Sequence, residues 1–499
     1  YGELARRSSA VARALRALGV RPGDRVAVML PNGFEFFECA LALAKIDAAL
    51  VPVNWHLGAE ELAWIVLDSG ASVLVTDAGI WASVHDFAGR APESSVVVVG
   101  GATTAGVTDY GTLPARAGDA GEGEAMDAGP GPALVFYTSG TTGRPKGVVH
   151  ARASEQANRP SAPDRSRQGL AQGGQVALWR WTSDEIHLLS GPAYHAGPCG
   201  WTLTALYAGA TTVILPAWDA RQWMTLVERH GVTRSFMVPS HFVRILEVPE
   251  EERRRRDLSS LRLIVHAAAP CPTGVKRRMI DELPSAEIWE LYGASEGGAT
   301  RISPQEWLER PGSVGLPWPG VRVSILDSEG RELPPGGTGL VYISPPGGAR
   351  FHYHNDVDKT AGAWRDDAFT VGDVGHLDDD GYLYITDRAS DMVIRGGVNV
   401  YPREAEDALY AHPAVVDCAV FGVPDPVLGE RLKAVVELRA PGVGAEDLIS
   451  HCRARLANFK CPEILEIVDT LPRDPNGKVL KRLLRDAHWV GTRSAVAAE

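Results

Sequence analysis

The stretch that decides the fold is "ALVFYTSGTTGRPKGVVH", residues 133–150, in which an apolar run passes abruptly into small and hydroxylated residues. Residues 138–147 alone hold three threonines, one serine, three glycines, a proline and a lysine. A simple turn needs only two or three residues of this kind. The excess predicts a loop with a binding role, placed directly after a buried strand.

A loop of this composition is suited to phosphate. Glycines let the backbone approach closely, hydroxyls and N–H groups donate hydrogen bonds to phosphate oxygens, and Lys146 supplies positive charge. The spacing differs from the P-loop, which needs four residues between its glycines and then Gly-Lys-Ser/Thr. Here Gly140 and Gly143 are three apart, and Pro145 precedes the lysine. We therefore expect a phosphate-binding loop of another class.

The chain as a whole is that of an ordinary globular protein. It has 499 residues, too many for one core, so two or more domains are expected. A net charge of −12 argues against nucleic acid as a partner. The basic run "EEERRRRDL" places Glu250–Glu252 four residues before Arg254–Arg256, which predicts helical ion pairs on a solvated face.

Six scattered cysteines without a CxxC pair indicate a reducing compartment, and neither a disulfide framework nor a zinc site. No apolar run approaches the roughly 20 residues of a membrane helix, and no signal peptide is recognised at the start. We expect a cytoplasmic protein without a membrane span. The sequence leaves the oligomeric state open.

Strand and helix patterns alternate along the chain, which predicts an α/β fold with parallel sheets covered on both faces. The pattern lapses between 151 and 178, where an exposed loop is expected, and short strands at about 312–386 predict a β-rich subdomain. We expect a large N-terminal domain of stacked αβ sheets at 1–389. A small mobile α+β C-terminal domain should follow at 390–499.

Six motifs in order resemble those of the adenylate-forming superfamily, which contains acyl-CoA synthetases, adenylation domains and luciferases. Besides the opening loop, they are "ELYGASEGGAT" (290–300), "GSVGLPWPG" (312–320), "FTVGDVGHLDDDGYLYITDR" (369–388), "DMVIRGGVNVYPREAEDAL" (391–409) and "LPRDPNGKVLKRLLR" (471–485). The chain is most similar to the bacterial acyl-CoA synthetases. The resemblance implies ATP and Mg²⁺, with CoA as the co-substrate.

The resemblance also implies a role for each matching residue. The β- and γ-phosphates would be held by Thr138, Ser139, Gly140, Thr141, Thr142, Gly143 and Lys146. Adenine would meet the backbone at Ala268 and Ala269 and the motif Tyr292, Gly293, Ala294 and Ser295, with Tyr292 stacking on the ring. Glu296 would bind Mg²⁺, Asp373 would accept both ribose hydroxyls, and Arg388 would help to fix the ribose.

The C-terminal domain would supply the remaining groups. Lys478 would bridge the attacking carboxylate and the α-phosphate, and the domain would then rotate to form a thiol tunnel lined by Gly396 and Gly397. The hinge matches Ser390, where the family usually has aspartate or lysine. This departure leaves rotation possible but with different energetics.

The acid pocket is expected around Tyr194, His195, His241, Ala267, Gly297 and Gly298. His195 matches an aromatic or histidine position at the mouth of this pocket, where it would gate the passage between the acid and thiol sites. The run "HAAAPCP" (266–272) carries alanines where the family commonly has glycines, which tightens the pocket floor. An aryl, bulky cyclic or fatty acid fits these residues.

Three functions follow from the sequence. The first is an AMP-forming acyl-CoA ligase, and the second is an amide synthetase in which an amine intercepts the acyl-adenylate. The third is a non-catalytic nucleotide-binding relative. Such a protein would have no reason to keep all five polar residues of the motifs: Lys146, Glu296, Asp373, Arg388 and Lys478. Magnesium-dependent pyrophosphate release separates the third from the others, and the acceptor separates the first from the second.

Overall fold

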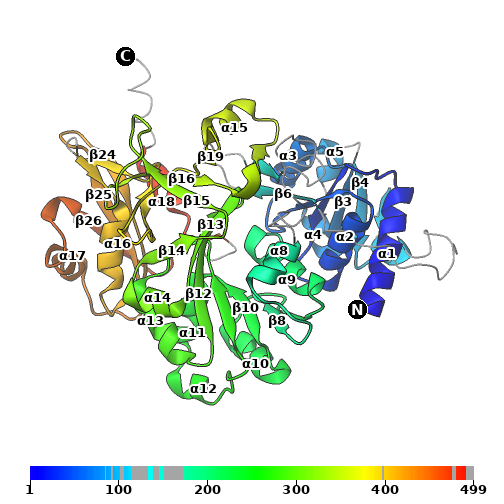
Figure 1. Cartoon of the computed structure of the whole chain (residues 1–499), viewed down its shortest axis with the longest axis horizontal. Helices are drawn as coiled ribbons and strands as arrows, with labels where there is room; N and C mark the ends of the chain where they lie inside the picture. Colours follow the sequence, from blue (N-terminus) through cyan, green and yellow to red (C-terminus); the bar gives the residue numbers. More distant parts are fainter. Residues whose placement is uncertain are drawn as a thin grey trace.

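The computed structural model describes residues 1–84, 86–91, 94–101, 106–113, 133–138, 145–150, 172–395, 398–474 and 479–489. Three β-sheets with flanking helices make up these residues, and they follow one another along the long axis of the molecule (Figure 1). The first sheet and the third lie at opposite ends, with the second sheet between them. The α/β fold class is confirmed.

The first sheet holds eight strands in the order β17-β7-β6-β2-β1-β3-β4-β5. Its strands are β17 (Phe351–Tyr353), β7 (Lys146–His150), β6 (Ala133–Thr138), β2 (Ala49–Pro52), β1 (Arg25–Met29), β3 (Val73–Asp77), β4 (Ser95–Val99) and β5 (Val107–Asp109). From β6 to β5 all neighbours are parallel. Such strands are buried on both faces, which is why they are rich in valine and alanine.

Helices from the same part of the chain cover the faces of the first sheet. They are α1 (Gly2–Ala17), α2 (Phe34–Lys45), α3 (Ala59–Ser69), α4 (Ala78–Ser83) and α5 (Phe87–Arg90). One face packs against α1 and α2 through Leu15, Phe36 and Leu43, each fully buried. The other face packs against α3 and α5 through Leu62 and Phe87.

The second sheet is the largest and holds thirteen strands. Its N-terminal part is β8 (Ile186–Leu189), β9 (Thr211–Ile214), β10 (Arg234–Met237), β11 (Leu263–His266), β12 (Glu287–Ala294) and β13 (Gly297–Ile302). The helices of this part are α8 (Gln172–Leu178), α9 (Ala196–Tyr207), α10 (Ala220–His230), α11 (Pro239–Glu247), α12 (Glu250–Arg254), α13 (Thr273–Glu282) and α14 (Pro304–Glu309).

The short strands expected at about 312–386 continue this same sheet, because β14 pairs with β13. They are β14 (Ser313–Pro317), β15 (Arg322–Leu326), β16 (Gly339–Ser344), β18 (Trp364–Arg365), β19 (Ala368–Phe369), β20 (Asp373–Leu377) and β21 (Leu383–Arg388). One strand of this segment, β17, leaves it and pairs with β7 of the first sheet. Helix α15 (Val357–Ala363) follows β17.

The third sheet is formed by five strands that begin at Val393. They are β22 (Val393–Arg395), β23 (Val398–Val400), β24 (Val415–Asp425), β25 (Gly429–Leu438) and β26 (Ile464–Val468), with helices α16 (Pro402–Tyr410), α17 (Ala445–Arg453) and α18 (Lys481–Trp489). The backbone N–H of Arg403 donates to Asp387 Oδ2 at 3.0 Å, which joins this sheet's first helix to β21 of the second sheet.

Two local expectations need correction. Residues 172–178, expected as exposed loop, form α8, while 151–171 lie outside the described residues. In the basic run, two of the three expected ion pairs form, Glu250 with Arg254 and Glu251 with Arg255. The third does not, because α12 ends at Arg254 and Arg256 turns to Glu228 at 3.1 Å. Among the described helices, none combines the length and apolarity needed to cross a membrane.

Candidate active site

The ends of the predicted phosphate loop face each other across two antiparallel strands. Thr138 on β6 pairs with Lys146 on β7. The loop residues between them, Ser139, Gly140, Thr141, Thr142 and Gly143, lie outside the described residues. The Thr138 hydroxyl is buried and has no hydrogen-bond partner within the part of the chain that is described. The two strand ends that flank the loop therefore place the Thr138 hydroxyl opposite Lys146.

Lys146 belongs to a closed triangle of polar side chains. Its Nζ atom donates to Glu296 Oε1 at 3.0 Å and to the Tyr353 hydroxyl at 2.9 Å. The Tyr353 hydroxyl in turn donates to Glu296 Oε1 at 2.8 Å. The side chain of Glu296 is only 5% exposed, so water screens these charges weakly. Burial, and next the Glu296 charge, raise the pKa of Tyr353, which keeps its hydroxyl protonated.

The donor set fits a magnesium ion that arrives with ATP. Within the described residues, no group of three or more His, Cys, Asp or Glu side chains is arranged to hold a metal ion. One buried carboxylate, Glu296, stands instead beside Lys146, which follows the predicted phosphate loop. Mg²⁺ is commonly bound by one or two carboxylates together with substrate phosphates.

A second polar cluster forms at the predicted ribose position. Asp373 Oδ2 accepts a hydrogen bond from the Tyr292 hydroxyl at 2.7 Å, and Oδ1 accepts one from Arg388 Nε at 3.1 Å. Asp373 is buried, and it lies directly opposite Arg388 in the β20–β21 ladder. These three residues, predicted separately from two motifs, are therefore brought together by the second sheet.

The predicted adenine residues lie at the ends of β11 and β12. Ala267, Ala268 and Ala269 follow β11, and Ala268 adopts a φ of +75°, a left-handed conformation that is unfavourable for alanine. Gly293 and Ala294 end β12. The Ser295 carbonyl accepts a hydrogen bond from His150 Nε2 at 2.7 Å, which ties this turn to β7.

Glycines make the β12–β13 hairpin unusually close. A Cβ atom on Gly293 would lie 2.8 Å from the Cα atom of Gly298, so no larger residue fits there. A Cβ atom on Gly298 would lie 2.6 Å from the Trp318 ring, and one on Gly297 would lie 3.1 Å from the Phe369 ring. The hairpin can thus present Glu296 at its tip with little bulk on either side.

The predicted acid-pocket residues come from three helices and loops. Tyr194 and His195 precede α9, and their ring centroids are 4.4 Å apart. Burial lowers the pKa of His195 to about 4, so this ring is neutral near pH 7. His241 on α11 stacks on Trp218 at 3.7 Å, whereas Ala267 packs with Trp201 and Phe236. His241 therefore belongs to a different aromatic contact from Ala267.

Lys478 lies outside the described residues, but the chain on either side of it is placed. Arg473 forms an isolated bridge with Val479, and its side chain pairs with Glu437 of β25 at 3.1 Å. Burial, and next the charge of Asp474, raise the pKa of Tyr194. Asp474, the last described residue before Lys478, therefore acts on Tyr194 of the predicted acid pocket through its charge.

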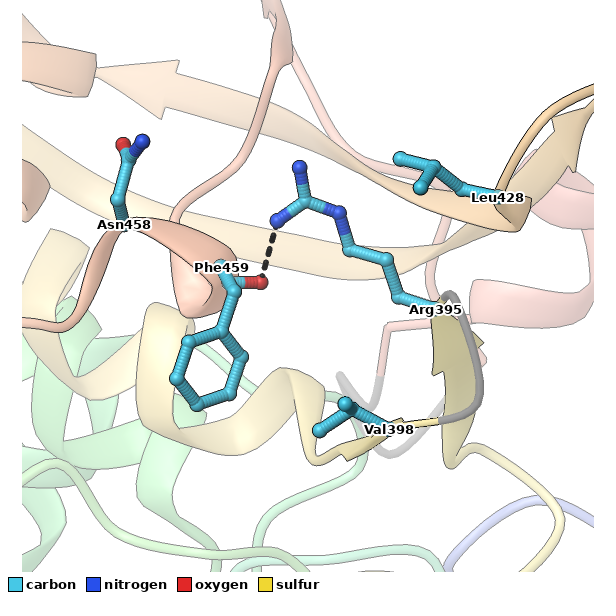
Figure 2. Close-up of a pocket in the computed structure, with 5 residues that line it drawn as sticks. All are labelled: Arg395, Val398, Leu428, Asn458 and Phe459. Carbon is cyan, nitrogen blue, oxygen red and sulfur yellow. Dashed lines mark hydrogen bonds between the residues drawn. The ribbon is translucent and has the colours of Figure 1, made fainter.

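The third sheet also carries an open pocket of about 470 Å³. Arg395, Val398, Leu428, Asn458 and Phe459 line it (Figure 2). Arg395 spans the pocket and donates to the Phe459 carbonyl at 2.7 Å. The predicted tunnel residues Gly396 and Gly397 fall outside the described residues. At the predicted hinge, the Ser390 carbonyl accepts a hydrogen bond from Arg485 at 3.4 Å.

Sequence reasoning missed two features of this region. Tyr353 joins the phosphate end only because β17 pairs with β7, and no motif of the opening loop points to a strand two hundred residues away. The second feature is Lys276 on α13, which is fully buried and donates to Glu290 Oε2 at 2.6 Å. Glu290 lies two residues before Tyr292 in the sequence. A lysine inside a helix reads as a solvated residue, so its burial could not be recognised.

Known families and proteins match this chain over most of its length. Residues 1–353 match the family described as AMP-binding enzyme, and residues 404–478 match the AMP-binding enzyme C-terminal domain. The chain belongs to the AMP-binding enzyme family. The predicted membership of the adenylate-forming superfamily is thus confirmed, and so is the enzyme class, an AMP-forming acid–thiol ligase.

Two relatives illustrate the range of the family. A fatty acid–[acyl-carrier-protein] ligase, ScoC of Streptomyces coeruleorubidus, is 35% identical over 98% of this chain and 91% of its own length. A feruloyl-CoA synthase of an Amycolatopsis species is 36% identical over 97% of this chain and 93% of its own length.

Solved structures have the same fold throughout. ATP-bound MatB of Rhodopseudomonas palustris superimposes with a TM-score of 0.83 and 30% identity, covering 98% of this chain and 93% of the other. The amide bond synthetase McbA of Marinactinospora thermotolerans does so with a TM-score of 0.83 and 27% identity, covering 97% and 94%. These likenesses support ATP as the nucleotide and leave the acid unspecified.

Proposed function

We propose that this protein activates a carboxylic acid with Mg·ATP, releases pyrophosphate to form an acyl-adenylate, and transfers the acyl group to the thiol of CoA. The observation that carries the proposal is the hairpin of β12 and β13. Tyr292 on one side of this hairpin joins the Asp373–Arg388 cluster, and Glu296 at its tip joins Lys146. A nucleotide lying along the hairpin would meet a carboxylate at its ribose and an ammonium at its phosphates.

The first half-reaction brings two anions together, so its catalysis consists mainly of charge neutralisation and positioning. Lys146 and the loop after Thr138 would hold the β- and γ-phosphates, and Glu296 would hold the Mg²⁺ that accompanies them. Asp373 would accept hydrogen bonds from the ribose hydroxyls. These would either replace the hydrogen bond from the Tyr292 hydroxyl or share the carboxylate oxygens with it. Tyr292 would then be free to stack on adenine.

Lys478 would complete the site by bridging the acid carboxylate and the α-phosphate. The influence of the Asp474 charge on Tyr194 supports this role, because Asp474 lies four positions before the lysine in the sequence. Arg473, held by Glu437, would fix the base of the lysine turn on the third sheet. A rotation of this sheet would then withdraw the lysine and admit the thiol.

For the acid we propose an aryl, bulky cyclic or fatty acid. The wall that includes Ala267 is aromatic and apolar: Trp179, Trp181, Trp201 and Phe236 pack around it. Trp201 and Phe236 have ring centroids 5.9 Å apart. His195 is neutral near pH 7, so it offers an acid no charge to pair with. Such walls suit apolar acids better than amino acids or dicarboxylates.

A second candidate is an amide synthetase, in which an amine intercepts the adenylate. The substitution of serine at the hinge, Ser390, favours it, since a changed hinge could leave the thiol step inefficient. The likeness to McbA supports the same reading at the level of the fold. CoA remains our first choice for the acceptor.

A product screen tests this proposal. The enzyme is incubated with ATP, Mg²⁺ and a pool of aryl, fatty and steroid acids, and the products are identified by mass spectrometry. Parallel samples contain CoA, a carrier protein bearing phosphopantetheine, or simple amines. Acyl-CoA is the expected product; amide or acyl-carrier product without acyl-CoA would replace the proposed acceptor, and no AMP in any sample would overturn the proposal itself.

A further inference from the structure

Tyr353, Lys146 and Glu296 form the triangle of hydrogen bonds described above. Of these three residues, Tyr353 is the one that no sequence motif identified. It is 4% exposed and stands at the end of β17, where it pairs with Val148 of β7. Its backbone N–H donates to Thr360 Oγ1 at 2.9 Å. The backbone of Tyr353 is therefore held from both sides, by a strand and by a hydroxyl from α15.

Its side chain engages Lys146 in two ways. The hydroxyl accepts a hydrogen bond from the Lys146 ammonium at 2.9 Å, and the ammonium also lies 4.1 Å from the centroid of the tyrosine ring. Because a desolvated cation over an aromatic face is attracted to it, the ring adds a second hold on Lys146. With Glu296, by contrast, the tyrosine makes one interaction, the hydrogen bond that its hydroxyl donates at 2.8 Å.

The triangle must open when Mg·ATP binds. In the proposed function, Lys146 would exchange the Glu296 carboxylate for phosphate oxygens, and Glu296 would exchange the ammonium for the metal ion. A hydroxyl can donate one hydrogen bond and accept two, and an ammonium has three donors. Tyr353 can therefore keep both of its contacts while Lys146 directs its other two donors to phosphate.

We propose that Tyr353 is a positioning residue for the β- and γ-phosphate end of Mg·ATP, holding Lys146 and Glu296 at their working separation before and after the nucleotide binds. The proposal rests on the proposed function, because it assumes that ATP occupies this site. It makes a specific demand: the tyrosine hydroxyl should matter for ligands that carry β- and γ-phosphates and a metal ion, and not for AMP.

The test is titration calorimetry of Tyr353→Phe with two ligands, AMP and a Mg²⁺ complex of a non-hydrolysable ATP analogue. The variant keeps the ring and loses the hydroxyl. We expect the affinity for the ATP analogue to fall roughly tenfold, as for one hydrogen bond to a charged group. The affinity for AMP should stay within about twofold of the wild type.

Two tyrosines serve as matched controls. The Tyr382 hydroxyl donates to Glu306 Oε1 at 3.1 Å, away from both polar clusters, so Tyr382→Phe should change neither affinity. The Tyr292 hydroxyl contacts Asp373 at the ribose end, so Tyr292→Phe should change both affinities equally. Unfolding of each variant is followed by circular dichroism to show that it is folded.

The outcomes distinguish a failure of the proposed function from a failure of the role proposed for Tyr353. If the wild type binds neither AMP nor the ATP analogue, the proposed function itself is contradicted. If the wild type binds both and Tyr353→Phe matches it, the role of Tyr353 is contradicted while the proposed function stands. An equal loss of both affinities in a folded Tyr353→Phe variant would mean a general structural role, which also overturns the inference.

Discussion

Asp373 and Arg388 stand directly opposite each other in the β20–β21 ladder, with Arg388 Nε 3.1 Å from Asp373 Oδ1. The arginine side chain is about half exposed, at 47%, whereas the aspartate is buried. Arg388 ends β21, the last strand of the second sheet before the third sheet begins at Val393. This pairing lets both residues serve the ribose site proposed above, because Asp373 and Arg388 already contact each other.

Replacing this carboxylate should weaken nucleotide binding whatever the phosphate content. Asp373→Asn keeps the shape but loses the charge, so we expect the affinities for AMP and ATP to fall by a similar factor of roughly ten or more. Titration calorimetry measures both. Asp380→Asn is the matched control, because Asp380 forms an exposed ion pair with Arg310 at 2.6 Å. A loss confined to ATP would contradict the ribose assignment.

Ala268 should respond to glycine. Its φ of +75° lies in the left-handed region, where alanine is strained and glycine is not. Ala268→Gly should therefore raise the free energy of unfolding by about 1 kcal/mol, with little change in the KM for ATP. Urea unfolding measures the change. Ala267→Gly, at a buried neighbour without positive φ, should lower stability, and a gain there would remove the conformational explanation.

The buried pair of Lys276 and Glu290 gives a stability prediction. Lys276 is fully buried, and its ammonium lies 2.6 Å from the carboxylate and 4.8 Å from the Trp307 ring centroid. Lys276→Met leaves the carboxylate buried without its partner, which should cost about 3–5 kcal/mol in urea unfolding. The double variant Lys276→Met/Glu290→Leu should recover most of this loss. No recovery would show that packing, rather than the unpaired charge, causes the loss.

Buried histidines predict a loss of stability toward acid pH. Burial lowers the pKa of both His187 and His241 to about 3. Because the folded pKa lies below the unfolded one, the neutral form contributes stability that is complete above about pH 6.5 and is lost as pH falls toward 3. Each histidine should contribute a slope of about 1.4 kcal/mol per pH unit in that window.

His241→Phe isolates one of these contributions, since phenylalanine can keep the stack on Trp218. The free energy of unfolding of wild type and variant is measured in urea at pH 7, 6 and 5. Between pH 6 and 5 the free energy of unfolding should fall less in the variant than in the wild type. The difference should be the contribution of one histidine, about 1.4 kcal/mol per pH unit. Parallel curves would mean that His241 becomes protonated without leaving its buried position.

Much of the fold could be predicted, and so could the residues that form the two polar clusters, because both depend on local patterns. Strands such as β1 and β6 are buried on both faces, so they appear as short apolar runs. Tyr292 and Glu296 belong to one uninterrupted motif and Asp373 to another, so each motif could be recognised locally. The second sheet then brings the two motifs together.

The features that were missed depend on pairing between distant segments. Tyr353 reaches Lys146 because β17 crosses from the second sheet's part of the chain to the edge of the first, and nothing local in "FHYHN" signals that crossing. Helix α8 lies in a stretch whose glycines and glutamines have low apolar periodicity, so tertiary contact with α9 decides its structure. The buried Lys276 depends on a partner, Glu290, on another element.

The exchange of labelled pyrophosphate into ATP tests the central claim most directly, because it reports reversible acyl-adenylate formation without any acceptor. With the acid identified by the product screen, the wild type should catalyse exchange that requires both the acid and Mg²⁺. Lys478→Ala should nearly abolish this exchange while still passing a preformed acyl-adenylate to the acceptor. Product formation from acid and ATP without any such exchange, or an equal loss of both steps in Lys478→Ala, would contradict the account.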